Sequence, residues 1–165
     1  MNDFKKIPLS FLSILVGLFS VPAICYGTLQ YFYPNQPDIV YSKQGNHYVV
    51  WNKLTNTAYY TEYVSKERNS DSDGLTVNVL VLRNYFEPQT EIMNNIPVTY
   101  SSAVLHETIN CQNQKITDEN IFVYSKNDAK GNLLRAIIGS DYEPIQATPG
   151  SVAERKVFEL CSYGA

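Results

Sequence analysis

The strongest strand signal in this 165-residue chain is the stretch Leu75–Phe86, LTVNVLVLRNYF. Its centre alternates valine with other residues: Val77, Asn78, Val79, Leu80, Val81 and Leu82. One face carries only valines, and the other changes from asparagine to leucine. The C-terminal half of this stretch is therefore apolar on both faces. Such strands are typical of the centre of a sheet. We therefore predict a sheet with this segment as a central strand.

Five further segments are rich in β-branched and aromatic residues and are bounded by turn-forming residues. They are His47–Leu54, Thr57–Val64, Val98–Cys111, Ile116–Ser125 and Leu133–Ile138. The connections include residues 54–57, 69–74, 87–90 and 127–131, and the pairs Asp73-Gly74 and Lys130-Gly131 suit the positive φ of hairpin turns. Because short connections favour antiparallel neighbours, the pattern predicts an antiparallel sheet of about six strands.

The end of the chain changes to a helical pattern. Pro149-Gly150 breaks the preceding segment, and Ser151 with Glu154 three residues later predicts a capping box at the start of a helix. Apolar residues then recur on one helical face, at i, i+4, i+7 and i+8: Ala153, Val157, Leu160 and Cys161. This face must pack on the sheet. The predicted class is therefore α+β, with about six antiparallel β-strands and one C-terminal α-helix.

One residue of the predicted core does not fit the pattern. In the segment 98–111, Glu107 falls on the face that carries Ala103, Leu105, Ile109 and Cys111. Neither composition nor periodicity explains a carboxylate on an apolar face.

The first 27 residues have the features of a secretory signal peptide. Two lysines precede the uncharged apolar run Phe11–Ile24, which is too short to cross a membrane comfortably as a helix. Cleavage is expected after Gly27, with cleavage after Cys25 as the alternative. Lipidation of Cys25 is disfavoured because Ile24, rather than a small residue, precedes it. The predicted organisation is a signal peptide at 1–27, an extended lead-in at 28–44 and one domain at 45–165, with no transmembrane segment after cleavage.

Cleavage also makes the cysteine count even. It removes Cys25 and leaves Cys111 and Cys161, which allow a single intramolecular bond in an oxidising compartment. We predict this disulfide, which would pin the end of the helix to the end of a strand. Closing a loop of about 50 residues would remove about 4 kcal/mol of unfolded-state entropy. Two buried free thiols are the alternative.

No arrangement of residues indicates a catalytic, cofactor-binding or metal site. The histidines, His47 and His106, lie inside predicted strands and belong to no spaced metal motif. The segment Asn69–Gly74 matches the first half of a calcium loop, but Leu80 occupies the position of the bidentate glutamate, and a hairpin turn explains the same residues. The net charge of −3 and the lack of a basic cluster argue against nucleic acid. We predict a protein that is not an enzyme and has no cofactor.

Aromatic residues are frequent, with 13 tyrosines in the chain. Trp51, Tyr59, Tyr60 and Tyr63 lie in the first two predicted strands and are the candidates for a binding surface or a dimer contact. By strand alternation, Tyr59 and Tyr63 share one face and Tyr60 takes the other. Packing within the core is the alternative explanation for each of them.

Two cysteine-containing stretches resemble a known family. They are Tyr100–Cys111, YSSAVLHETINC, and Pro144–Cys161, PIQATPGSVAERKVFELC, with Tyr124 and the Lys130-Gly131 turn in order between them. Together they are similar to the surface-adhesin protein E-like domain of Gram-negative bacteria. Trp51 and the Tyr59–Tyr63 region resemble its opening strands more loosely, so the resemblance spans roughly Tyr48–Cys161.

The resemblance implies a six-stranded antiparallel sheet with a C-terminal helix, dimers, and adhesion to host extracellular proteins. The family usually has an aromatic residue directly before the proline of the last loop, where this sequence has Glu143. The hypothesis is an exported binding or adhesion module at the outer-membrane surface of a Gram-negative bacterium, with host extracellular-matrix proteins or a second copy of the chain as partners. A periplasmic structural or envelope-associated protein without a host ligand is the alternative, and a hydrolase with an unrecognised site is a third.

We expect the mature protein to begin at Thr28, or at Tyr26 with the earlier cleavage, and to carry no lipid. N-terminal sequencing together with the intact mass of protein purified from cells checks this. A blocked N-terminus at Cys25 with the added mass of a diacylglyceryl group would contradict it.

Overall fold

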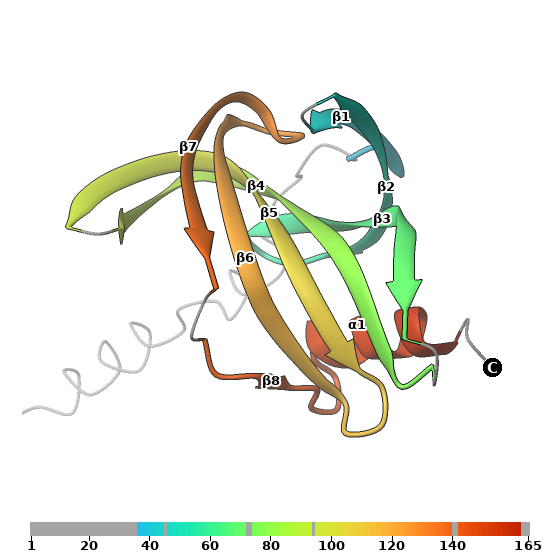
Figure 1. Cartoon of the computed structure of the whole chain (residues 1–165). Coiled ribbons are helices and arrows are strands. Elements are labelled where there is room, and N and C mark those ends of the chain that lie inside the picture. Colours follow the sequence, from blue (N-terminus) through green and yellow to red (C-terminus); the bar gives the residue numbers. More distant parts are fainter. Residues whose placement is uncertain (1–35, 45, 72–73, 94, 140–141, 163–165) are drawn as a thin grey trace, which may run out of the picture. The chain divides into compact units, whose positions relative to one another are not determined.

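The structure is a computed structural model that describes residues 36–44, 46–71, 74–93, 95–139 and 142–162. In this part of the chain, eight strands form one antiparallel sheet and a single helix follows them (Figure 1). The signal peptide predicted at 1–27 and residues 28–35 of the predicted lead-in lie outside the described residues. Among the described residues, no helix is both long and apolar enough to span a membrane.

Each strand from β1 to β6 pairs with the next strand along the chain, and β8 pairs with β6. The strands are β1 (Ile39–Gln44), β2 (His47–Asn56), β3 (Tyr60–Ser70), β4 (Thr76–Met93), β5 (Ile96–Asn110), β6 (Lys115–Lys126), β7 (Lys130–Ile138) and β8 (Ile145–Gln146); the helix is α1 (Val152–Cys161). The predicted antiparallel sheet with one C-terminal helix is confirmed, and the segment around Val81 is central, as expected. The predicted number of six strands is wrong, because β1 and β8 join the sheet.

The strand β1 lies inside the predicted extended lead-in. Val40 and Ser42 are buried whereas Ile39 and Tyr41 are exposed, which is the alternation of a strand with one face on a core. Ser42 also accepts a hydrogen bond from the indole N–H of Trp51 on β2, at 2.7 Å. The end of the lead-in is thus an edge strand of the sheet.

The predicted connection at Glu87–Thr90 is not a turn. The strand β4 continues through it to Met93, and its pairing with β5 is irregular between Asn84 and Gln89. Pro88 has no N–H to donate, so it is tolerated where the ladder is interrupted. The chain reverses next to Asn95, which has a positive φ of 63°, and β4 and β5 form a long hairpin (Figure 1).

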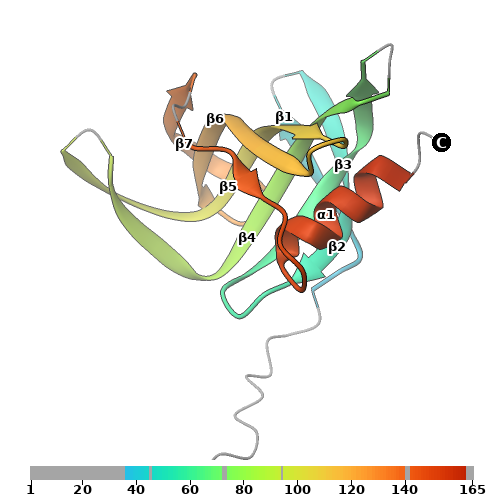
Figure 2. The same cartoon turned by 90° about the horizontal axis from the view of Figure 1, so that it is seen from below.

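Apolar side chains pack on both faces of the sheet. The helix face, toward α1, has a core that includes Val77, Val79, Val81, Ala103, Leu105, Ile109, Ile116, Val157 and Leu160. The opposite face has a second core of Val40, Trp51, Tyr63, Leu82, Val104 and Ala129. Figure 2 shows α1 lying across the strands on the first of these faces. The predicted apolar stripe of the helix is therefore packed on the sheet.

The start of α1 is held by reciprocal caps. The hydroxyl of Ser151 accepts a hydrogen bond from the N–H of Glu154 at 3.0 Å, and the Glu154 carboxylate accepts one from the N–H of Gly150 at 2.7 Å. The second bond reaches one residue before the N-cap, so the predicted capping box is present in a shifted form.

The other end of α1 is tied covalently to the sheet. Cys161, the last helical residue, is bonded to Cys111, which directly follows β5. The predicted disulfide is confirmed, and it joins two segments that are 50 residues apart in the sequence.

We expect Cys161→Ala to lower the free energy of unfolding by about 2–5 kcal/mol, because the open chain gains unfolded-state entropy and α1 loses its anchor. Urea unfolding of the oxidised protein and the variant measures this difference. Cys111→Ala and the double variant serve as controls, and both should lose about the same amount because each lacks the same bond. Equal midpoints for the wild-type protein and all three variants would contradict the prediction.

Candidate functional site

Two of the four aromatic candidates are part of the core. Trp51 and Tyr63 are both 0% exposed and pack in the cluster on the opposite face of the sheet. Burial raises the pKa of Tyr63 to about 12, with the charge of Asp128 as a further cause. Neither ring is available for a contact at the surface of the folded chain, so packing explains both.

The other two candidates lie at the start of β3. Tyr59 is 72% exposed and precedes the strand, in a turn where the Thr57 hydroxyl accepts hydrogen bonds from the N–H groups of Tyr59 and Tyr60. The predicted shared face of Tyr59 and Tyr63 does not hold, because strand alternation begins only at Tyr60. Tyr60 is half-buried, and the guanidinium of Arg83 lies 5.3 Å from its ring centre. Of the four candidates, Tyr59 is the most exposed.

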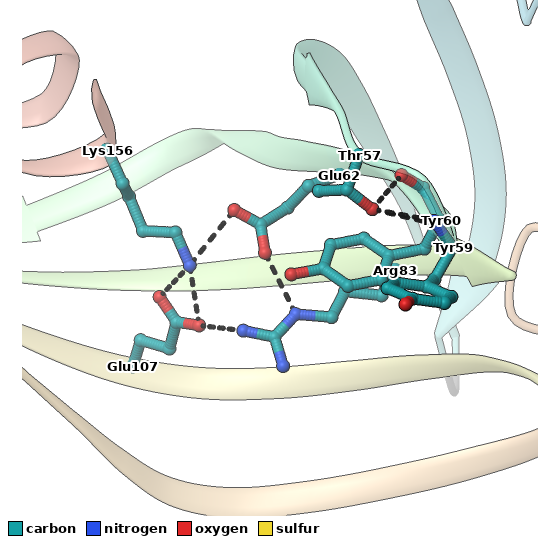
Figure 3. A network of polar contacts seen from close by, with 7 residues as sticks. All are labelled: Thr57, Tyr59, Tyr60, Glu62, Arg83, Glu107 and Lys156. Atoms are coloured by element: carbon teal, nitrogen blue, oxygen red, sulfur yellow. Dashed lines mark hydrogen bonds and ion pairs between the residues drawn. The ribbon is translucent and has the colours of Figure 1, made fainter. Parts of the chain in front are cut away.

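A buried network of four charged side chains lies between the sheet and α1 (Figure 3). The Lys156 ammonium is 2.8 and 2.7 Å from the two Glu107 oxygens and 3.1 Å from an oxygen of Glu62. Arg83 lies 2.8 Å from Glu62 through Nε and 3.4 Å from Glu107 through Nη2. These contacts explain the carboxylate that the sequence places on the apolar face of β5.

The network has two positive and two negative side chains. Burial raises the pKa of Glu62, but the charges of Lys156 and Arg83 outweigh this effect and hold the pKa below its usual range. Burial lowers the pKa of Lys156, and the two carboxylates more than compensate and raise it. Glu107 is fully buried, and burial raises its pKa despite the adjacent ammonium.

A pocket of about 300 Å³ opens on the helix face beside this network. It is lined by Arg83, Tyr85, Glu91, Met93, Tyr100, Ala103, Leu105, Asp118, Ile121, Val123, Ile137, Tyr142, Glu143 and Ile145. The rings of Tyr85 and Tyr100 meet edge to face with centres 5.4 Å apart. The Tyr100 hydroxyl donates a hydrogen bond to Glu91 at 2.7 Å, which holds that carboxylate at the pocket. The pocket combines apolar, aromatic and acidic groups.

The other motifs that the sequence singled out have structural explanations. His47 is exposed, and His106 packs against Phe122 with ring centres 5.2 Å apart, where burial lowers the pKa of His106. Gly74, at a positive φ of 69°, donates its N–H to the carbonyl of Asp71, as in a hairpin turn; Asp73 lies outside the described residues. Within the described part of the chain, no group of three or more His, Cys, Asp or Glu residues could hold a metal ion.

Sequence reasoning missed the charged network, although a signal was present. Lys156 follows Ala153 by three residues and precedes Leu160 by four, so it belongs to the same helical stripe as both. A lysine on the buried side of the helix and a glutamate on the buried side of the strand are complementary. The pocket had no such signal, because its lining comes from the five strands β4 to β8 and from Tyr142 and Glu143.

One comparison with known proteins shows a family. A family model described as "Surface-adhesin protein E" matches residues 51–162. Two solved structures of Haemophilus influenzae protein E are similar in fold. The first matches with a TM-score of 0.51 and 12% identity, and the match covers 77% of this chain and 96% of that chain. The second, crystal form II, matches with a TM-score of 0.49 and 12% identity, and the match covers 67% of this chain and 92% of that chain. None of the curated protein sequences compared with the chain matches it.

We expect Lys156→Met to lower the free energy of unfolding by about 3 kcal/mol or more, because it leaves Glu62 and Glu107 buried with only Arg83 between them. Chemical unfolding at pH 7 measures the change. The matched control is Arg155→Met, which removes a cation from an exposed neighbouring position together with its hydrogen bond to Thr55, and should cost only about 1 kcal/mol. Equal effects of the two substitutions would show that the network does not support the fold.

Proposed function

The chain belongs to the surface-adhesin protein E family, and we propose that it is an exported bacterial binding module, without catalytic activity, that contacts host extracellular proteins at the cell surface. Family membership over residues 51–162 is the observation that carries this proposal. The similar fold of Haemophilus influenzae protein E supports the architecture alone, because the identity is 12%.

The surface of the described chain offers features suited to protein binding. Tyr59 projects from the turn before β3, and Tyr48 on β2 is 74% exposed. Exposed tyrosines provide a large contact area at low entropic cost. The pocket on the helix face adds a concave site with both apolar and charged groups, which is the usual composition of a binding site.

A second copy of the chain is a further partner that we propose. Tyr59 is the member of the predicted aromatic set that remains open to such a contact. Tyr59→Ser should then weaken self-association in light scattering, whereas Tyr63→Ser would act through the core and lower stability instead.

The alternative function is a periplasmic structural or envelope-associated protein without a host ligand. The predicted leader supports export and does not discriminate between the two sides of the outer membrane. Accessibility to protease on intact cells discriminates between them.

We expect proteinase K added to intact cells to digest the protein while a soluble periplasmic control protein survives. After permeabilisation of the outer membrane, both should be digested. The purified mature protein should also bind to immobilised extracellular-matrix proteins and leave an albumin-coated surface empty.

Protection of the protein on intact cells, combined with digestion after permeabilisation, would contradict surface display and favour the periplasmic alternative. Digestion on intact cells without binding to any matrix protein would contradict the host-protein partner. The two measurements therefore test the location and the partner separately.

A further inference from the structure

The pocket lies on the part of the helix face that α1 leaves uncovered. Figure 1 shows α1 at the lower end of the sheet, whereas the β4–β5 hairpin extends away from it at the other end. Met93 and Tyr100, from this hairpin, line the pocket together with Ile137 on β7 and Tyr142. With a volume of about 300 Å³, the pocket is at the small end of the range for ligand sites, and this size suits a single side chain.

Much of the pocket lining is apolar. Side chains of the helix-face core continue into it: Ala103, Leu105, Ile121 and Val123. Tyr85 and Tyr100 extend this surface with aromatic rings. A ligand that enters must therefore have an apolar part that displaces water from these side chains.

The charge that faces the ligand is negative. Arg83 lines the pocket, but it lies within 2.8 Å of Glu62 and 3.4 Å of Glu107, and the four-residue network to which it belongs has no net charge. Two exposed carboxyl residues of the lining lie outside that network: Glu91 and Glu143. Arg135 on β7 pairs in register with Val123 and therefore lies on the same face of the sheet as the pocket, but it is not one of the residues that line it.

We propose that this pocket binds the side chain of a lysine or arginine of a protein partner. The aliphatic stem of that side chain packs on Leu105, Ile121 and Val123, and its cationic end lies among the carboxylates. Tyrosine faces also attract cations, and Tyr142, which is 53% exposed, stands at the pocket beside Glu143. An anionic ligand would be repelled by Glu91 and Glu143, and a purely apolar one would bring no charge to complement theirs.

The assignment of the partner as a protein rests on the proposed function, whereas the preference of the pocket for a basic side chain does not. The probe is therefore a small molecule: Nα-acetyl-lysine methylamide, titrated into the isotope-labelled mature protein and followed by NMR. The norleucine analogue has the same aliphatic stem without the charge, and the glutamate analogue has the opposite charge.

We expect saturable shifts at Leu105, Ile121, Val123 and Ile137 with the lysine analogue, at least about fivefold weaker binding of the norleucine analogue and no binding of the glutamate analogue. Glu91→Gln/Glu143→Gln should weaken binding of the lysine analogue by about tenfold, because two carboxylates are removed while the amide oxygen introduced at position 91 can still accept from the Tyr100 hydroxyl. The matched control is Glu67→Gln/Glu87→Gln, which removes two exposed carboxylates outside the pocket and should leave binding unchanged.

Equal binding of the lysine and norleucine analogues, shifts that map away from the pocket, no saturable shifts, or equal effects of the two double variants would each overturn the inference. If matrix proteins fail to bind while the lysine analogue occupies the pocket, the proposed host partner is wrong and the pocket assignment stands. If matrix proteins bind and the lysine analogue does not, the proposed function stands and the pocket assignment is wrong.

Discussion

Lys156 carries its ammonium group to the interface between α1 and the sheet, where its side chain is only 3% exposed. A cation in that position is tolerated because Glu62 and Glu107 meet it, and the same carboxylates would be costly to bury without it. Moving α1 by one turn would take Lys156 out of reach of both and would also strain the disulfide at Cys161. The position of the helix on the sheet is thus specified by an ionic contact near its middle and a covalent one at its end.

Local signals in the sequence were sufficient for most of the fold. The six predicted strand segments all appear, and the helix starts at the predicted cap, because these features depend on neighbouring residues alone. The same reasoning singled out Glu107 as an anomaly but could not provide its partners. Lys156 is 49 residues away and Glu62 is on another strand, and only the folded sheet brings them together.

Sequence reasoning also failed where the outcome depends on residues that only the folded sheet brings together. Glu87–Thr90 contains proline and polar residues, yet β5 keeps this stretch in a strand by pairing on both sides of the irregularity. Trp51 and Tyr63 could have been surface or core residues, since both types occur in each environment. The outcome depends on which side chains lie opposite them in the folded sheet. Val40 lies opposite Trp51 and Ser42 accepts its indole N–H, and both come from a strand that composition alone presents as a lead-in.

Arg83 connects the stability of the fold with the character of the pocket. Its guanidinium lines the pocket and would, if it were unpaired, oppose the negative charge of Glu91 and Glu143. Glu62 and Glu107 neutralise it from the side of the sheet that α1 covers, and they can do so only because Lys156 balances the second of their two charges. The contact that positions the helix therefore also leaves the pocket acidic. A change in the network would alter both how firmly α1 is held and which charge the pocket presents to a ligand.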